Sequence, residues 1–260
     1  MLCASRHVCA GSVRYASASE PYFSTTIGRT PALIVKSQRG FSLIEIAIVI
    51  VITGSLLGTI IKGQELITSS RVRNVAAQLE GVKIAYLGFQ DRYRALPGDY
   101  SGALAATNLP GPAGSPTLGC ANLVTCANGK IDDTNDNESI LAWHQLARAG
   151  FLVGNYDGLG TVSSATNAPT NPFGGYLQLI FDNVYSDVAA PAPALNIKTG
   201  GNIPSPLVAE LDRKLDDGEP QTGAFRFSSF DGSTASCITG APVKHNASLN
   251  ITNCGGAQLQ

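Results

Sequence analysis

The chain has 260 residues, of which 44% are hydrophobic and only 14% are charged, and its formal net charge is −1. This composition is typical of a folded protein and excludes wholesale disorder. It also argues against nucleic-acid-binding proteins, which carry a strongly basic surface, so no direct nucleic-acid binding is expected.

The charge is distributed unevenly along the chain. Residues 1–40 hold five of the 18 basic residues and a single acid, Glu20. Residues 41–260 therefore hold 13 basic and 18 acidic residues. Because basic residues before an apolar segment favour retention of that flank in the cytoplasm, we expect the rest of the chain to be exported.

Residues 41–61 form an apolar segment with one ionisable side chain, Glu45. As a helix with a rise of ~1.5 Å per residue, the segment would reach about 30 Å, the thickness of a hydrocarbon core. A secretory signal peptide would have a shorter apolar core and a cleavage site of the A-x-A kind after it. The segment is predicted to span a membrane, with a buried core helix as the alternative.

Glu45 is unusual because a carboxylate inside hydrocarbon costs roughly 2.5 kcal/mol or more. A position near the membrane interface, from which the side chain reaches water, is one explanation. Cleavage between Gly40 and Phe41 gives another, because it would create a cationic α-amino group at Phe41. Within one straight helix this amine and Glu45 are poorly placed to pair. Between adjacent, axially staggered copies they are well placed.

The segment from Lys36 to Glu45 reads KSQRGFSLIE. It resembles the class III signal sequence of type IV pilins and type II secretion pseudopilins, which has a basic leader end, Gly before the cleavage point, Phe after it and Glu as the fifth mature residue. The resemblance implies that a prepilin peptidase cleaves after Gly40 and methylates the Phe41 amine. It also implies that Glu45 neutralises the amine of a neighbouring subunit.

The same resemblance implies partners and a location. The partners are prepilin peptidase, other pilin or pseudopilin subunits and an assembly platform protein. The subunit would lie in the inner membrane before assembly, with its head in the periplasm, and would then enter a filament that can be extracellular.

Residues 1–40 would be the leader. A leader of this length is long for the family, and residues 1–35 superficially look like an organellar transit peptide, because they contain Arg and Ser and are nearly free of acids. A simpler hypothesis is a start at Leu33 or Val35 through an alternative initiation codon. In that case residues 1–34 are a mis-assigned start.

Residues 62–94 carry an amphipathic pattern. Apolar positions recur at alternating spacings of three and four residues, which predicts one helical stripe. Its members are Val72, Val75, Leu79, Val82, Tyr86, Phe89 and Tyr93. A single helix is expected from Phe41 to Tyr93, ended by Ala95-Leu96-Pro97-Gly98. The stripe would hold this helix to a head, and a coiled-coil seam with another protein is the alternative.

Residues 95–260 are predicted to form a periplasmic or extracellular α+β head. A loop is expected at 98–130, and a helix with Asn137 as N-cap and Gly150 as C-cap. A further helix is expected from Pro206 to Leu215, with Asp212 as a surface or turn acid. Strands are expected at Tyr176–Phe181 and Ala224–Ser228. The predicted fold class is a long N-terminal helix, membrane-spanning in its first half, packed on a small antiparallel sheet.

Four cysteines lie in the head: Cys120, Cys126, Cys237 and Cys254. An even number in an exported head suggests two disulfides, and pairing 120–126 with 237–254 is the shortest of three connectivities. The second pair resembles the C-terminal disulfide loop of many pilins. Zinc is disfavoured because neither pair has C-x₂-C spacing and the three histidines are scattered.

An oxygen-rich turn precedes the first head helix. Calcium favours such hard oxygen ligands, and the resemblance to pseudopilins makes a structural calcium ion an option. The candidate ligands are Asp132, Asp133, Asn135, Asp136 and Glu138. The spacing departs from an EF-hand, whose sixth position would be Asn137 in place of Gly. The alternative is a solvated turn whose acids favour the helix N-terminus.

The sequence shows no catalytic constellation. It has neither a G-x-S-x-G motif nor a phosphate-binding glycine motif, and His144 beside Trp143 is expected to be a packed or surface residue and not a base. We therefore expect no enzyme and no cofactor besides the calcium option. The expected function is that of a pilin-like structural subunit of a type IV pilus or type II secretion pseudopilus. The alternative is a minor pilin or membrane-tethered adhesin whose head binds a ligand.

Overall fold

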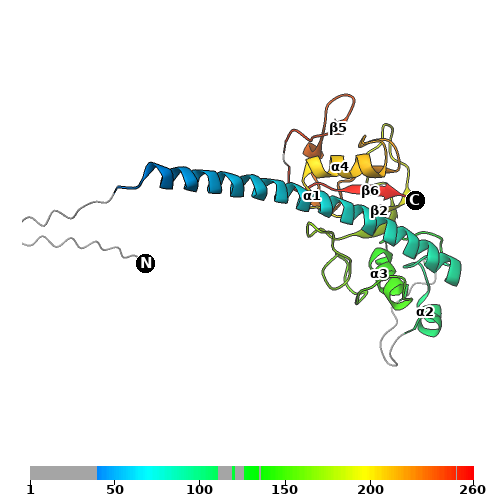
Figure 1. The fold of residues 1–260 in the computed structure, drawn as a ribbon. Helices are drawn as coiled ribbons and strands as arrows, with labels where there is room; N and C mark the ends of the chain where they lie inside the picture. The colour runs from blue at the N-terminus through cyan, green and yellow to red at the C-terminus, as the bar shows by residue number, and fades with distance from the viewer. Residues whose placement is uncertain (1–39, 111–118, 121–125, 135, 250) are drawn as a thin grey trace, which may run out of the picture. The chain divides into compact units, whose positions relative to one another are not determined.

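A computed structural model of the protein describes residues 40–110, 119–120, 126–134, 136–249 and 251–260. The chain divides after Ile52 into two units, and each is described by itself. The helices are α1 Leu43–Tyr93, α2 Gly102–Asn108, α3 Glu138–Arg148 and α4 Ser205–Leu215 (Figure 1). The strands are β1 Gln178–Asp182, β2 Ala194–Lys198, β3 Phe225–Phe227, β4 Ile238–Thr239, β5 Lys244–His245 and β6 Gly256–Leu259, with short 3₁₀ turns η1 Phe230–Gly232 and η2 Ala235–Cys237. The fold is α+β, as predicted.

Helix α1 is continuous over 51 residues. It begins two residues later than predicted, because the Ser42 carbonyl accepts the backbone N–H groups of Glu45 and Ile46 and so opens the first turn. The helix ends at Tyr93, as the sequence predicts. Arg94 follows with φ 54°, a left-handed conformation that cannot continue an α-helix.

The first part of α1 exposes its apolar side chains. Residues 41–61 are exposed throughout, and the most apolar 18-residue window of the helix has no buried residue. By length and composition α1 is able to cross a membrane.

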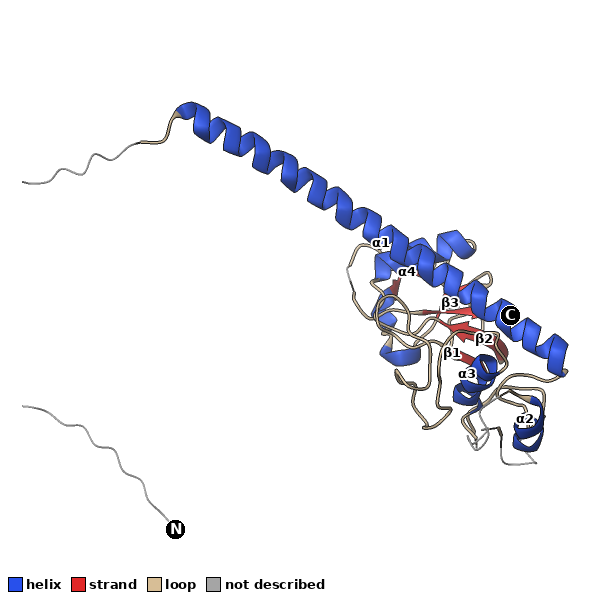
Figure 2. Cartoon of the chain, turned by 60° about the horizontal axis from the view of Figure 1, so that its bottom comes forward, coloured by secondary structure: helices blue, strands red, loops and turns tan. Residues whose placement is uncertain are grey.

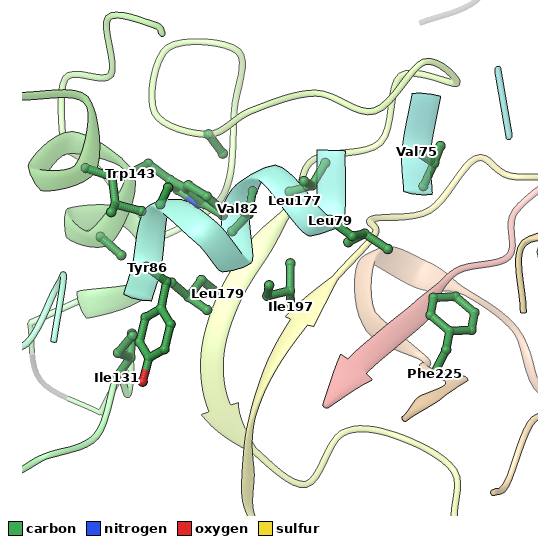
Figure 3. Packing of buried hydrophobic residues seen from close by; sticks show 14 of the residues in the cluster. Val75, Leu79, Val82, Tyr86, Ile131, Trp143, Leu177, Leu179, Ile197 and Phe225 are labelled. Carbon is green, nitrogen blue, oxygen red and sulfur yellow. The ribbon is translucent and has the colours of Figure 1, made fainter. Parts of the chain in front are cut away.

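The second part of α1 packs against the head. The predicted stripe is confirmed: Val72, Val75, Leu79, Val82, Tyr86 and Phe89 are buried, and Tyr93 is half-buried. Figure 3 labels Leu79 and Val82 together with Leu177 and Ile197 of the sheet region, and all four belong to one core cluster. Burial of each such side chain contributes about 1.5–3 kcal/mol, so the stripe is a main source of stability for the head.

The main sheet has the strand order β1-β2-β6-β3, and every neighbouring pair is antiparallel. Leu179, Ile197 and Phe225 belong to the core cluster that contains the α1 stripe, and Figure 2 shows these strands beside α1. Gln178 pairs with Lys198 and Ile180 with Asn196. Since alternate residues of a strand point to opposite faces, these residues form the other face of the sheet.

Two predicted strands are present, as β1 and β3, but β2 and β6 were not predicted. The predicted loop at 98–130 was wrong in part, because α2 forms within it. Asn137 does occupy the N-cap position of α3, but its φ of 50° is left-handed and its side chain makes no capping bond. The Asp133 carboxylate caps the helix instead, accepting the Ser139 N–H at 3.0 Å. Ala149 is the C-cap, and Gly150 follows it with φ 81°.

Candidate functional site

The segment around Gly40 is open. Gly40, Phe41 and Ser42 precede α1, and Phe41 is 78% exposed. A Cβ atom built on Gly40 would meet no atom of the described residues within 4 Å. The peptide bond between Gly40 and Phe41 is therefore sterically accessible. The predicted leader up to residue 39, with its alternative starts, lies outside the described residues.

Glu45 lies in the first turn of α1, where the partial positive charge of the helix end favours an acid. Among the described residues, ion pairs at this helix join Lys62 to Glu65 at 2.9 Å and Asp91 to Arg94, the residue after α1, at 3.6 Å. Neither pair includes Glu45, so no cationic side chain of the described residues neutralises this carboxylate in the apolar part of the helix.

Residues 35–61 match the family model of the prokaryotic N-terminal methylation motif. The chain carries the hallmark of a pilin-type cleavage site. This motif marks type IV pilins and pseudopilins, as predicted. A search of the curated proteins and a search of the solved structures each found no match. The matched residues 35–61 lie before the head, so the match carries no information about the head.

The pilin-type motif indicates a structural subunit of the pilin or pseudopilin kind. It implies processing by prepilin peptidase and assembly with other pilin subunits. Together with the apolar helix it indicates membrane anchoring before assembly.

Both cysteine pairs of the head are at disulfide distance. Cys120 pairs with Cys126 and Cys237 with Cys254, with Cα–Cα distances of 5.6 and 5.8 Å. The second bridge closes residues 237–254 into a loop that contains β4 and β5. Cys254 also exchanges backbone hydrogen bonds with Ile203, which ties this loop to the segment before α4.

A buried pair fastens the same loop to α4. The Nε2 atom of His245 lies 2.6 Å from Oδ2 of Asp212, and the Asp212 side chain is fully buried. Burial raises the pKa of Asp212, and the contact with His245 opposes this shift. The expectation that Asp212 is a surface or turn acid was wrong. Its position four residues after the buried Val208, on the same helix face, was the available signal.

The acidic turn before α3 is engaged by the protein itself. Both oxygens of Asp133 accept hydrogen bonds from Ser139, and Oδ2 also accepts the amide of Gln178 at 3.2 Å. Asp132 Oδ1 accepts the Thr134 N–H at 3.1 Å. Glu138 turns inward, is only 2% exposed, and accepts the Asp132 N–H at 2.9 Å.

The environment of Glu138 favours its neutral form. Burial, helped by the nearby charges of Asp99, Asp132 and Asp136 and opposed by the hydrogen bond from the Asp132 backbone, raises the pKa of this carboxyl to about 7. Its Oε1 lies 3.2 Å from the Sγ of Cys120. A disulfide sulfur has no proton to donate, so this contact does not stabilise the ionised carboxylate.

The residues predicted for calcium are only partly gathered. Among the described residues, the metal-ligand atoms found within 4.8 Å of one another belong to Cys120, Cys126 and Asp136. The two sulfurs are joined in a disulfide, so they are not available as ligands. Asn135 lies outside the described residues. A calcium ion at Asp132, Asp133, Asp136 and Glu138 stays a prediction, and so does the alternative of a solvated turn.

His144 is packed, one of the two positions that the sequence left open. It is 6% exposed, and its Nδ1 lies 2.6 Å from the Tyr156 carbonyl oxygen. The short distance to a carbonyl requires Nδ1 to carry the proton and donate it. His144 therefore ties α3 to the segment that follows it.

Proposed function

We propose that the chain is cleaved after Gly40, methylated on the Phe41 amine and assembled through the first part of α1 into a type IV pilus or type II secretion pseudopilus. The match of residues 35–61 to the methylation motif carries the proposal. The exposed apolar residues 41–61 and the accessible Gly40–Phe41 bond support it.

The negative charge of Glu45 provides the attraction between neighbouring subunits during assembly. Cleavage creates a cation at Phe41, and an N-methylated amine remains protonated. In a medium of low dielectric constant, two opposite charges attract far more strongly than in water. Pairing of Glu45 with the Phe41 amine of an axially staggered neighbour would neutralise both groups and set the register between subunits.

The stripe on the second part of α1 links this assembly to the head. In the proposal, an assembly platform protein receives the subunit from the inner membrane, and the head lies in the periplasm until the filament forms. The basic flank before Gly40 and the acidic composition after it support this orientation. The two disulfides fit an oxidising compartment outside the cytoplasm.

Mass spectrometry of the protein from membranes of the native host tests the processing step. The expected N-terminal peptide begins with a methylated Phe41. A peptide that retains residues before Phe41 in the assembled protein would overturn the proposal.

A substitution at Glu45 tests the assembly step. Glu45→Val is expected to be cleaved and methylated normally but to be absent from filaments that contain wild-type copies. Glu65→Gln is the matched control, because Glu65 is an exposed acid of the same helix beyond the apolar segment. Normal incorporation of Glu45→Val would contradict the pairing.

Recovery of the chain in filaments sheared from the cell surface would favour a pilus over a pseudopilus.

A further inference from the structure

One lysine of the head is buried in the sheet. Lys198 of β2 is only 1% exposed, and its Nζ contacts Oδ2 of Asp182 on the neighbouring strand β1. In the other lysine–acid pairs among the described residues, both side chains are at least 33% exposed. Charges buried as deeply as that of Lys198 lose their hydration, which costs free energy. The Lys198–Asp182 pair therefore differs in its surroundings from the surface pairs of the same chain.

Lys198 and Asp182 lie on the same face of the sheet. Gln178 is opposite Lys198 in the register, and Asp182 follows Gln178 by four positions on β1, so the alternation of the strand places both on one face. On this face, Nζ of Lys198 also lies over the ring of Phe230, 5.1 Å from its centre. The nitrogen is therefore held between a carboxyl group and an aromatic ring.

The two oxygens of the Asp182 carboxyl have different partners. Oδ2 contacts the lysine, whereas Oδ1 accepts two N–H groups, from the Asn196 amide at 3.0 Å and the Val184 backbone at 3.1 Å. Two N–H donors at about 2.7–3.1 Å from one oxygen stabilise the negative charge of a tetrahedral intermediate in acyl transfer. Oδ1 therefore has the surroundings of an oxyanion, and Oδ2 lies beside the group that can protonate it.

Burial also favours the neutral form of the lysine. It lowers the pKa of Lys198, and the contact with Asp182 and the nearby charge of Asp133 oppose this shift. A neutral amine is a nucleophile, whereas an ammonium group is not. In water an acid and an amine form a salt rather than an amide, because both ions are well hydrated. Within the sheet this hydration is reduced, so the neutral acid and amine become accessible.

We propose that Lys198 and Asp182 condense into an isopeptide bond that joins β1 to β2. The ammonium first gives a proton to Oδ2, which leaves an amine and a carboxylic acid. Nζ then attacks Cγ of Asp182, and Asn196 and Val184 stabilise the negative charge that develops on Oδ1. When the Cγ–Oδ2 bond breaks, Oδ2 takes a second proton from the nitrogen and departs as water. The products are one amide and one water molecule, so no oxidant or cofactor is required.

The side chain of Asp182 is 18% exposed, which gives the released water a way out of the sheet. The new bond would hold the edge strand β1 covalently to β2. This modification goes beyond the assembly function proposed above. It requires only a folded head, and neither cleavage nor filament formation, so the two proposals succeed or fail separately.

Intact-mass spectrometry of the full chain, purified from membranes and with its disulfides reduced, tests the proposal. The expected mass is lower than that of the unlinked chain by one water molecule in most of the molecules. Tryptic digestion then localises the loss. Residues 149–197 contain neither lysine nor arginine, and trypsin does not cut after a lysine whose amine has become an amide. The expected product is one peptide from Ala149 to Arg213 that lacks one water, in place of the peptides 149–198 and 199–213.

Two variants identify the reacting groups. Asp182→Asn changes the leaving group, so the link is expected to form with loss of ammonia in place of water. Lys198→Arg keeps the positive charge, but a guanidinium stays protonated and cannot attack, so the full mass should return. Lys214→Arg is the matched control, because Lys214 also pairs with an acid, Glu210, but is 33% exposed. It should leave the loss of water unchanged.

Three results would overturn the proposal. The first is a wild-type chain of full mass that trypsin cuts after Lys198, which would leave an ion pair only. The second is a loss of water that tandem mass spectrometry assigns to other residues. The third is a link that persists in Lys198→Arg. The first two are measured on the wild type, so the test stays valid if the variants fail to fold.

Discussion

The two parts of α1 share one helical backbone but differ in what covers them. From Leu43 to Ile61 the side chains are mostly apolar, and all of them are exposed. From Val72 to Phe89 one stripe of apolar side chains is buried by the head, while Ile84 and Leu87 outside the stripe are exposed. The second part alternates apolar and charged positions, whereas the first part is apolar on all sides.

The difference separates two sources of helix stability. An apolar stripe needs one partner surface, and the sheet supplies it within the same chain. A helix that is apolar on every side needs an apolar environment on every side, which a membrane or a bundle of equivalent helices provides. The first part therefore depends on assembly, and the second part depends on folding.

The largest effect is expected from truncating the buried stripe. Phe89 is fully buried and packs against Tyr93, Tyr100 and Phe151 with ring-centre distances of 4.7, 5.9 and 6.3 Å. Phe89→Ala should lower the free energy of unfolding by about 3–5 kcal/mol. Urea unfolding in micelles, followed by near-UV circular dichroism of the buried Trp143, measures it.

Leu57→Ala is the control for this measurement. Leu57 is 61% exposed in the first part of α1, so its truncation should change the unfolding free energy by less than about 0.5 kcal/mol. Equal effects of the two variants would show that the two parts of α1 are not energetically distinct.

A pH titration is expected to change the stability of the head through Glu138. Glu138 has an ordinary pKa of 4.5, which applies to the unfolded chain, and a folded pKa of about 7. The folded state therefore holds the proton more tightly. Stability should be highest below about pH 4.5 and fall by at most about 3 kcal/mol as the pH rises through 7. Urea unfolding across this range measures the slope.

Glu138→Gln tests the cause of the slope, because the variant cannot ionise and should flatten it. Buried Asp99 and Asp212, whose pKa values are also raised by burial, contribute any slope that remains.

Calcium separates the two interpretations of the acidic turn. A bound cation favours the ionised carboxylates and would abolish the slope in the wild type. A solvated turn would leave it unchanged.

The smallest effect is expected from glycine-to-alanine substitutions on two faces of α1 beside the head. A Cβ atom at Gly81 meets nothing within 4 Å, whereas one at Gly88 would lie 2.7 Å from a ring carbon of Phe151. Gly81→Ala should stabilise the protein by about 0.5–1 kcal/mol, since alanine favours the helix. Gly88→Ala should lose this gain, because the Phe151 ring must move. Thermal unfolding midpoints of the two variants measure the difference, and equal gains would contradict the close packing.

The sequence predicted the elements whose signals are local. The apolar run and the stripe of α1 have fixed periods, and the motif from Lys36 to Glu45 is contiguous. Strands β2 and β6 escaped prediction because their signal is mixed. Asn196 and Lys198 point to a buried polar face, so the usual rule that polar residues face water does not apply to them.

The sites of the head depend on contacts between distant residues. Asp212 and His245 are 33 positions apart in the sequence, and Asp133 and Gln178 are 45 apart. The spacing of residues along the sequence does not reveal which distant residues are in contact. Asn137 shows a further limit, because the residue type suits an N-cap but the left-handed backbone turns its side chain away from that role.

The place of β6 in the sheet has a consequence for biosynthesis. Residues 256–259 form an inner strand, between β2 and β3, although they come after both in the chain. Until residues 256–259 have been synthesised, the sheet lacks its inner strand β6. The facing edges of β2 and β3 are then unpaired. Such edges readily pair with other chains. The nascent head therefore needs protection until its last strand is made.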